Sequence, residues 1–285
     1  MKKIVVTTAV FLSLATIFFF FVPAFQGQLS YASSIKIGSF VFRLYGLILA
    51  LSILAGYLVV RINSWRFGID KEEVDNLVFW LVLIGIIGAR VYYVIFDYNF
   101  FVSNPDEIYK IWHGGMSIFG SIIAGLVFIV VWTRKKAYSQ YQLLDLAALG
   151  LTISQALGRF GNFFNQEAFG YPTDLPWKMY IEPKFRPREF QESNFFHPAF
   201  LYEAVAMIAV FFILRKLLGK VPSGVLAFSY LAMYSFVRFF VEAIRVDSNY
   251  IQGFKADQLT AFALMAISFV VIFWRLRHIE PVRNK

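Results

Sequence analysis

The chain has 285 residues, of which 59% are hydrophobic, 19% are aromatic and only 16% are charged. A soluble domain is nearer a quarter charged, so this composition excludes an ordinary soluble enzyme and indicates a polytopic membrane protein. The formal net charge of +9 does not favour nucleic-acid binding, because the basic residues stand in short clusters beside apolar runs. The absence of cysteine excludes disulfides, thiolate metal sites and a cysteine nucleophile.

Eight apolar runs each approach the roughly 20 residues that a membrane-spanning helix needs. They lie near residues 4–22, 40–60, 74–96, 116–133, 142–158, 198–218, 223–242 and 257–274. We predict an all-α membrane helix bundle with a seven-span core in a domain at 38–285 and an extra N-terminal apolar helix. With Lys2 and Lys3 in the cytoplasm, the basic clusters fall on the cytoplasmic side and the C-terminus does too.

The first run belongs to a leading segment, residues 1–37, which is either a signal peptide or an uncleaved signal anchor. Small residues near Pro23 and Ala24, and again at 31–34, would permit cleavage. The run is long and rich in phenylalanine, so we favour the anchor.

The stretch 159–197 holds four prolines, which exclude a continuous helix through it. We therefore predict an irregular extracytoplasmic cap over the membrane domain. No clear internal repeat is visible, which disfavours a transporter built from inverted repeats.

Residues 158–170 carry a polar cluster where the span at 142–158 ends. Polar groups are costly in hydrocarbon, so this cluster is expected to face a protein interior or a water-filled cavity. Arg159 suits a phosphate, since a guanidinium is always charged and matches phosphate oxygens. Snorkelling of Arg159 to the interface is the alternative, and the accompanying Asn162, Asn165 and Glu167 make it the weaker one.

A second polar stripe lies in the span at 223–242. Tyr234, Arg238, Glu242 and Arg245 follow at spacings of four, four and three, which places them on one face of a helix. Such a stripe either binds a ligand in a cavity or contains an Arg238–Glu242 pair that only holds helices together. The residues by themselves leave both readings open.

Further polar positions open other spans. His113, Gly114 and Gly115 precede the fourth span, and a lone interfacial histidine there is more often structural than catalytic. Three histidines without cysteine make a metal site improbable, and no metalloprotease, serine-hydrolase or nucleotide-binding motif is present. We expect neither a metal nor another cofactor.

These segments together resemble the bacterial prolipoprotein diacylglyceryl transferase family. The main match is the glycine-arginine-x-glycine-asparagine-phenylalanine-x-asparagine-x-glutamate stretch at 158–167, closed by Gly170. The resemblance extends over about residues 38–278, and the matching stretch is specific to the family. Supporting matches are Tyr45-Gly46, the stretch from Gly85 through Arg90 to Tyr93, Gly114 to Ser117, His197-Pro198 with Leu201 to Glu203, and the Tyr234, Arg238, Glu242 pattern.

The resemblance implies an enzyme of the bacterial cytoplasmic membrane, with its active site toward the outer face. It would transfer the diacylglyceryl group of phosphatidylglycerol to the thiol of a lipobox cysteine in a prolipoprotein, and release glycerol phosphate. As catalytic residues it suggests Arg238, Arg159, Glu242 and Tyr234. As substrate-binding residues it suggests Arg159, Asn162, Asn165, Glu167, Gly170, Tyr45, Gly114, Gly115, His197 and Glu203.

One position departs from the family pattern. Members often have histidine after the glycine-glycine-methionine-serine-x stretch, where this chain has Phe119. A mechanism that depends on this histidine as a base is therefore in doubt. Glu242, Glu167 or Tyr234 would have to accept the proton, or the positive field of the cavity would lower the pKa of the thiol.

Two other classes of function stay open on the residues. One is a transporter or lipid-binding protein that holds an anionic ligand with the same arginines. The other is a catalytically silent relative, for which Phe119 is the only support.

Overall fold

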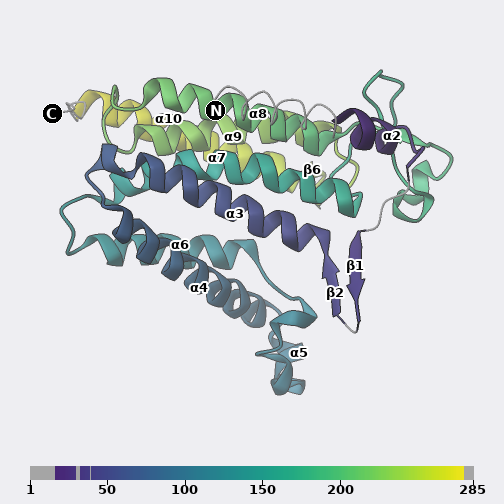
Figure 1. Cartoon of the computed structure of the whole chain (residues 1–285), viewed down its shortest axis with the longest axis horizontal. Helices are drawn as coiled ribbons and strands as arrows, with labels where there is room; N and C mark the ends of the chain where they lie inside the picture. Colours follow the sequence, from purple (N-terminus) through teal and green to yellow (C-terminus); the bar gives the residue numbers. More distant parts are fainter. Residues whose placement is uncertain (1–16, 30–32, 39, 279–285) are drawn as a thin grey trace, which may run out of the picture. The chain divides into compact units, whose positions relative to one another are not determined.

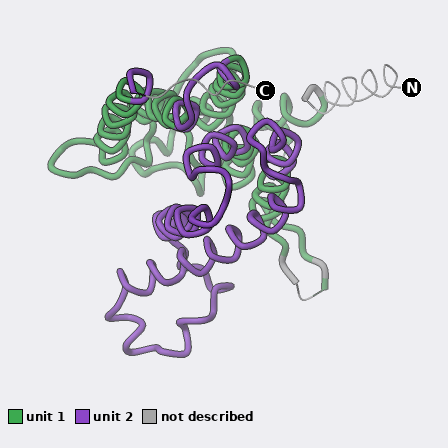
Figure 2. Tube along the Cα trace, turned by 90° about the vertical axis from the view of Figure 1, so that its left-hand side faces the viewer, with its two compact units in different colours: residues 1–56, 151–216, 228–274 green, residues 57–150, 217–227, 275–285 purple. Residues whose placement is uncertain are grey.

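The computed structural model describes residues 17–29, 33–38 and 40–278 (Figure 1). Most of the apolar run expected at 4–22 lies outside these residues. Two compact units are coloured in Figure 2: unit 1 comprises residues 1–56, 151–216 and 228–274, and unit 2 comprises residues 57–150, 217–227 and 275–285.

Each of the seven apolar runs expected for the core coincides with a helix. These are α3 (Leu44–Asn63), α4 (Lys71–Phe96), α6 (Ile118–Thr133), α7 (Gln140–Asn165), α8 (Ala199–Leu217), α9 (Val225–Ile244) and α10 (Ala256–His278). Within the part of the chain that the structure describes, five of them are long and apolar enough to cross a membrane, namely α3, α4, α7, α9 and α10. Since α6 has 16 residues and α8 contains Glu203, Arg215 and Lys216, the count of seven spans stays a prediction.

Small residues bring α4 and α6 of unit 2 into close contact. A Cβ atom on Gly120 would lie 2.2 Å from the Gly88 carbonyl oxygen, so only glycine fits there. One turn away, the Ser121 hydroxyl donates to the Gly85 carbonyl oxygen at 2.8 Å. At the other end of the pair, Glu73 accepts hydrogen bonds from the hydroxyl of Tyr138 and the indole of Trp132.

The connection between α4 and α6 folds around Arg90, a buried residue of α4. It contains α5 (Tyr98–Ser103), η3 (Pro105–Glu107) and η4 (Ile111–His113). The Arg90 guanidinium donates to four backbone carbonyl oxygens, those of Glu107, Ile108, Gly114 and Gly115. This buried cation is therefore satisfied by backbone dipoles, and it shapes the loop.

In unit 1, α7 continues through the polar motif and ends at Asn165, so the stretch expected to be irregular from 159 begins only at 166. The turn at Gln166 and Ala168, with φ of 50° and 54°, ends the helix. From there to residue 198 the chain has no long helix. It forms a small antiparallel hairpin of β3 (Met179–Tyr180) and β4 (Phe195–Phe196), and the single turns η5 (Pro183–Phe185) and η6 (Arg188–Phe190).

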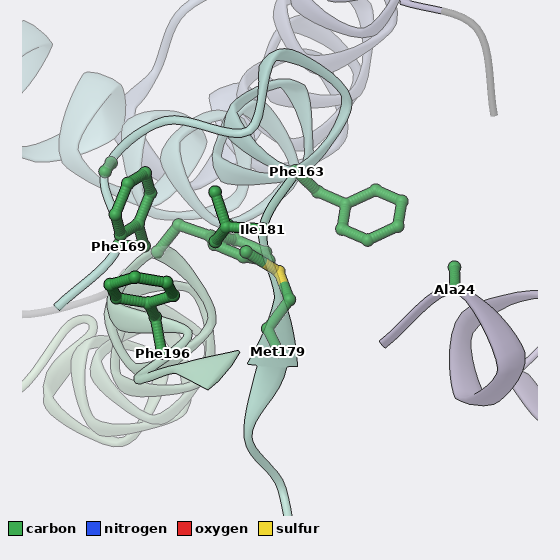
Figure 3. Packing of buried hydrophobic residues seen from close by; sticks show 8 residues of the cluster. Ala24, Phe163, Phe169, Met179, Ile181 and Phe196 are labelled. Carbon is green, nitrogen blue, oxygen red and sulfur yellow. The ribbon is translucent and has the colours of Figure 1, made fainter. Parts of the chain in front are cut away.

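A hydrophobic cluster anchors this irregular segment (Figure 3). Met179, Ile181 and Phe196 of the segment are fully buried with Phe163 of α7. Ala24 of the short α2 (Val22–Phe25) is part of the same cluster, and the rings of Phe21 and Phe25 pack on Phe163. Residues 20–25 are thus part of the core of unit 1.

Two further hairpins complete the described chain. They are β1 (Ser34–Ile37) with β2 (Phe40–Arg43), which leads into α3, and β5 (Tyr250–Ile251) with β6 (Phe254–Lys255), which joins α9 to α10. A π-helical turn, η1 (Ile17–Phe21), precedes α2, and a 3₁₀ turn, η2 (Ser64–Phe67), follows α3.

Candidate active site

Three helices of unit 1 meet at one buried carboxylate. Glu203 of α8 is 1% exposed, and its Oε1 accepts a hydrogen bond of 3.0 Å from Nη1 of Arg238 on α9. Its Oε2 forms an ion pair with Nη2 of Arg159 on α7. The two arginines that the sequence suggests for a phosphate are therefore neighbours, joined through Glu203.

The polar stripe of α9 continues this network. Nη2 of Arg238 lies 2.9 Å from Oε2 of the buried Glu242, as the four-residue spacing predicts. The same Nη2 is also paired with the carboxylate of Asp257, in the first turn of α10. Arg245 contacts Glu242 at 3.8 Å and is bound more closely, at 2.7 Å, by Asp247.

The tyrosines expected near the arginines pack as aromatic residues. The ring of Tyr45, at the start of α3, lies where a Cβ atom on Gly161 of α7 would approach it to 2.7 Å. The ring of Tyr234 stacks on that of Tyr230 one turn earlier in α9, with centroids 6.2 Å apart.

The chain turns back at the end of the motif, so that Glu167 contacts the last turn of α7; this turn is called the fold-back. The side-chain amide of Asn162 donates to Oε1 of Glu167 at 2.8 Å, and that of Asn165 donates to the same oxygen at 3.3 Å. Gln166 is buried and has a structural role, since its side-chain oxygen accepts a 2.7 Å hydrogen bond from the backbone N–H of Glu182.

A cavity of about 460 Å³ lies beside this fold-back. Its lining residues are Ser33, Asn165, Gln166, Glu167, Phe169, Phe185, Arg186, Pro187, Val246 and Asp247. Asn165 and Glu167 of the motif thus line this cavity and provide polar groups in its wall.

Gly170 has no room for a side chain. An added Cβ atom would lie 2.8 Å from both the Cβ atom of His197 and the backbone oxygen of Ile244. The Gly170 N–H donates to the His197 carbonyl at 2.8 Å, and the N–H of the next residue, Tyr171, donates to the Ile244 carbonyl at 2.9 Å. The absence of a side chain at Gly170 therefore lets the irregular segment pack against the end of α9.

His197 lies in a short hydrogen-bond chain. The indole of Trp177 donates to the Tyr202 hydroxyl at 2.8 Å, and that oxygen is 3.0 Å from Nδ1 of His197. The tautomer of His197 decides which of the two groups donates in this second contact. Partial burial lowers the pKa of His197, because it disfavours the charged imidazolium.

Gly114 and Gly115 belong to unit 2, where their carbonyl oxygens accept from Arg90 at 2.7 and 2.8 Å. In the same loop, Nδ1 of His113 is 2.7 Å from Oε2 of Glu107. Hydrogen bonds from Lys110 and His113 lower the pKa of the Glu107 carboxyl. Phe119, the departure from the family pattern, is 59% exposed.

Sequence reasoning missed three members of the cluster. Asp247 and Asp257 bind the arginines, and the ammonium of Lys255 donates to the carbonyl oxygens of Glu242 and Arg245 at 2.7 and 2.9 Å. Asp247 stands two residues after Arg245, and this spacing is only a weak indication that the two side chains form an ion pair. Nothing in the sequence pairs Asp257 with Arg238, because a hairpin separates their helices.

Comparison with known proteins identifies the family of the chain. The model of a family described as prolipoprotein diacylglyceryl transferase matches residues 32–274. Among similar proteins is the phosphatidylglycerol–prolipoprotein diacylglyceryl transferase of Fervidobacterium nodosum, 40% identical over 271 residues that cover 93% of each chain. The proteins of the same name from Thermotoga petrophila and Thermotoga maritima are 39% and 38% identical, over 99% and 94% of this chain and 99% and 92% of their own lengths. The chain belongs to the prolipoprotein diacylglyceryl transferase family.

Proposed function

We propose that this protein transfers the diacylglyceryl group of phosphatidylglycerol to the thiol of a lipobox cysteine in a prolipoprotein. The observation that carries the proposal is the convergence of Arg159 and Arg238 on the buried Glu203, within a chain of this family. Two guanidinium groups held side by side at membrane helices suit a phosphate-bearing lipid. The relatives named above carry this reaction in their names.

In the reaction, the cysteine sulfur attacks the glycerol carbon that bears the phosphate. A carbon–sulfur bond forms and the carbon–oxygen bond to phosphate breaks, so that glycerol phosphate leaves with the electron pair and the thiol gives up its proton. Negative charge grows on the leaving oxygen, and Arg238 and Arg159 are placed to stabilise it. Glu203 and Glu242 hold the Arg238 guanidinium in position before the substrate arrives.

Nearby guanidinium groups, and not a carboxylate base, would favour loss of the thiol proton, since Glu242 is already the counter-ion of Arg238 and Arg245. A free thiol has a pKa of about 8.5, so a modest lowering by nearby guanidinium groups supplies enough thiolate at neutral pH.

The other motif residues are proposed to shape the head-group site. Asn162, Asn165 and Glu167 form a hydrogen-bonded set, and Gly170 keeps the irregular segment close to the end of α9. Tyr45 and Tyr234 would supply hydroxyl groups. Gly114 and Gly115, in the loop before α6 of unit 2, stay substrate-binding residues predicted from the sequence alone.

We also propose the finer topology. All seven helices from α3 to α10, without the short α5, would cross the cytoplasmic membrane, with the segment at 166–197 on the outer side. The basic clusters at 61–71, 134–136, 215–220 and 275–285 would then face the cytoplasm.

The proposal is tested with purified protein, phosphatidylglycerol and a lipobox peptide. We expect a peptide heavier by one diacylglyceryl group, and a loss of roughly a hundredfold or more in rate for Arg159→Ala and Arg238→Ala. Arg188→Ala, at an exposed position of the irregular segment, is the matched control with unchanged rate. Binding of phosphatidylglycerol without any modified peptide would contradict the proposal and favour a silent relative.

A further inference from the structure

Arg238 is paired with more negative charge than a phosphate-binding arginine needs. Its guanidinium contacts the carboxylates of Glu203, Glu242 and Asp257. The connected cluster contains the cations Arg159, Arg238, Arg245 and Lys255 and the carboxylates Glu203, Glu242, Asp247 and Asp257. The formal charges balance, so an anionic phosphate gains little from the cluster unless one carboxylate withdraws.

The carboxylates differ in their ability to withdraw. The side chains of Glu203 and Glu242 are 2% and 1% exposed, and neither reaches water without a large rearrangement of its helix. Asp257 has a side chain that is 51% exposed, and a rotation about its own bonds hydrates it.

Asp247 is also half-exposed, but it is held differently. It forms two hydrogen bonds with Arg245, at 2.7 and 2.8 Å, and stands only two residues from that arginine in the chain. It is therefore fixed on Arg245, and Asp257 is the carboxylate that covers Arg238.

The backbone position of Asp257 lowers the cost of its release. Asp257 lies in the first turn of α10, where the unpaired N–H groups of the helix favour a negative charge. After leaving Arg238, the carboxylate keeps this stabilisation and gains water.

We infer that Asp257 occupies the phosphate position on Arg238, and that the phosphate of phosphatidylglycerol binds by displacing it. This inference rests on the proposed function. Asp257 is thus a residue that sets the affinity for the anionic lipid: the phosphate must compete with an internal carboxylate, while Glu203 and Glu242 keep the guanidinium in place.

The inference predicts that Asp257→Asn lowers the apparent KM for phosphatidylglycerol roughly twofold to fivefold, the range expected for release of one partly exposed ion pair. The measurement is the lipobox-peptide assay in mixed micelles, with the full-length protein and a varied mole fraction of phosphatidylglycerol. Asp257→Glu keeps the charge and is expected to retain a KM near that of the wild type.

Asp174→Asn is the control for a general charge effect. Asp174 is fully exposed and pairs with Lys178, so its removal changes the net charge of the protein by the same amount without touching Arg238. An equal fall in KM for Asp174→Asn, or no fall for Asp257→Asn, would overturn the inference.

A failure of the proposed function is recognised separately. If the wild-type protein forms no product, the transferase proposal is wrong, and binding of fluorescent phosphatidylglycerol to the wild type and to Asp257→Asn tests the displacement alone. Tighter binding by the variant supports the inference, and equal binding contradicts it.

Discussion

At the scale of single residues, the buried carboxylate of Glu203 decides how the arginines of the site are held. It stands early in α8, and it contacts arginines that lie before and after it in the sequence, on α7 and α9. A buried carboxylate is stable only when it is paired, and here two guanidinium groups share it. Glu203 is therefore a positioning residue, which fixes Arg159 and Arg238 relative to each other.

We predict that Glu203→Gln lowers the transfer rate by roughly a hundredfold and the free energy of unfolding by about 3 to 5 kcal/mol, because it leaves two arginines without their common partner. The measurements are the peptide assay and thermal unfolding in detergent. Glu192→Gln, at an exposed position of the irregular segment, serves as the control. A stable, fully active Glu203→Gln protein would show that the arginines do not need this carboxylate.

His197 gives a prediction for the dependence of stability on pH. Its pKa is lowered in the folded protein, mainly by burial, so below pH of about 6.5 the unfolded chain binds more protons than the folded one. The free energy of unfolding therefore decreases as the pH falls below about 6.5 towards the lower pKa of the folded protein. Above pH of about 6.5 this contribution to stability is fully present. In His197→Asn, which keeps a hydrogen-bond acceptor without a titrating group, part of this fall should disappear. Unfolding midpoints between pH 5 and 8 measure the effect, and identical pH profiles for both proteins would refute it.

At the scale of elements, the glycines of the polar motif let α7 pack closely against α3. An added Cβ atom on Gly161 would lie 2.7 Å from the ring of Tyr45 on α3, whereas one on Gly158 would be 3.6 Å from the Ser52 hydroxyl. The Ser154 hydroxyl also donates to the Ser52 carbonyl oxygen at 2.9 Å. These contacts hold α7 against α3 at the start of the motif. They therefore fix the orientation of the part of α7 that carries Arg159.

The two glycines form a matched pair of variants. Gly161→Ala should destabilise the protein by about 1 to 3 kcal/mol, because Tyr45 must move. In Gly158→Ala the new Cβ atom would lie at an ordinary van der Waals distance from Ser52. This substitution should leave the free energy of unfolding unchanged or raise it by up to about 1 kcal/mol, since alanine favours a helix. Thermal unfolding of both variants in the same detergent measures the difference. Equal effects would show that close packing on Tyr45 is not what requires the glycine.

At the scale of the whole molecule, the N-terminal segment has a structural role in addition to that of a targeting signal. Residues 20–25 contribute rings to the cluster that holds the irregular segment of unit 1, and Gly27 lies against the ring of Tyr180. Cleavage near 31–34 would detach these rings from that core. We therefore propose that the segment is retained as an anchor and expect the intact mass of the purified protein to include it.

A pair of phenylalanine variants tests this role. Phe25→Ala should lower the free energy of unfolding by about 1 to 3 kcal/mol, since its ring stacks on that of Phe163 with centroids 5.7 Å apart. Phe19→Ala, at a position that is 75% exposed, should change it by less than about 0.5 kcal/mol. Resistance of the segment at 166–198 to protease provides a second measurement. Equal loss in the two variants would argue against a structural role of the N-terminal segment.

The positions of the seven helices, and of the polar residues within them, could be predicted from the amino-acid sequence. This is possible because length and apolar composition are local properties, and because a polar side chain that faced lipid would be costly, so that it must face protein or water. The spacing of Arg238 and Glu242 also identified their contact, since it lies within one helix.

Which residues share a partner becomes visible only in the folded protein. The bridge from Arg159 through Glu203 to Arg238 joins three helices, and the Asp257 contact joins a fourth. Arg90 stands in an apolar span of the sequence, but its four carbonyl partners come from a loop whose path the sequence pattern does not specify. Such contacts depend on which helix faces meet, and this is set by the packing of many side chains at once.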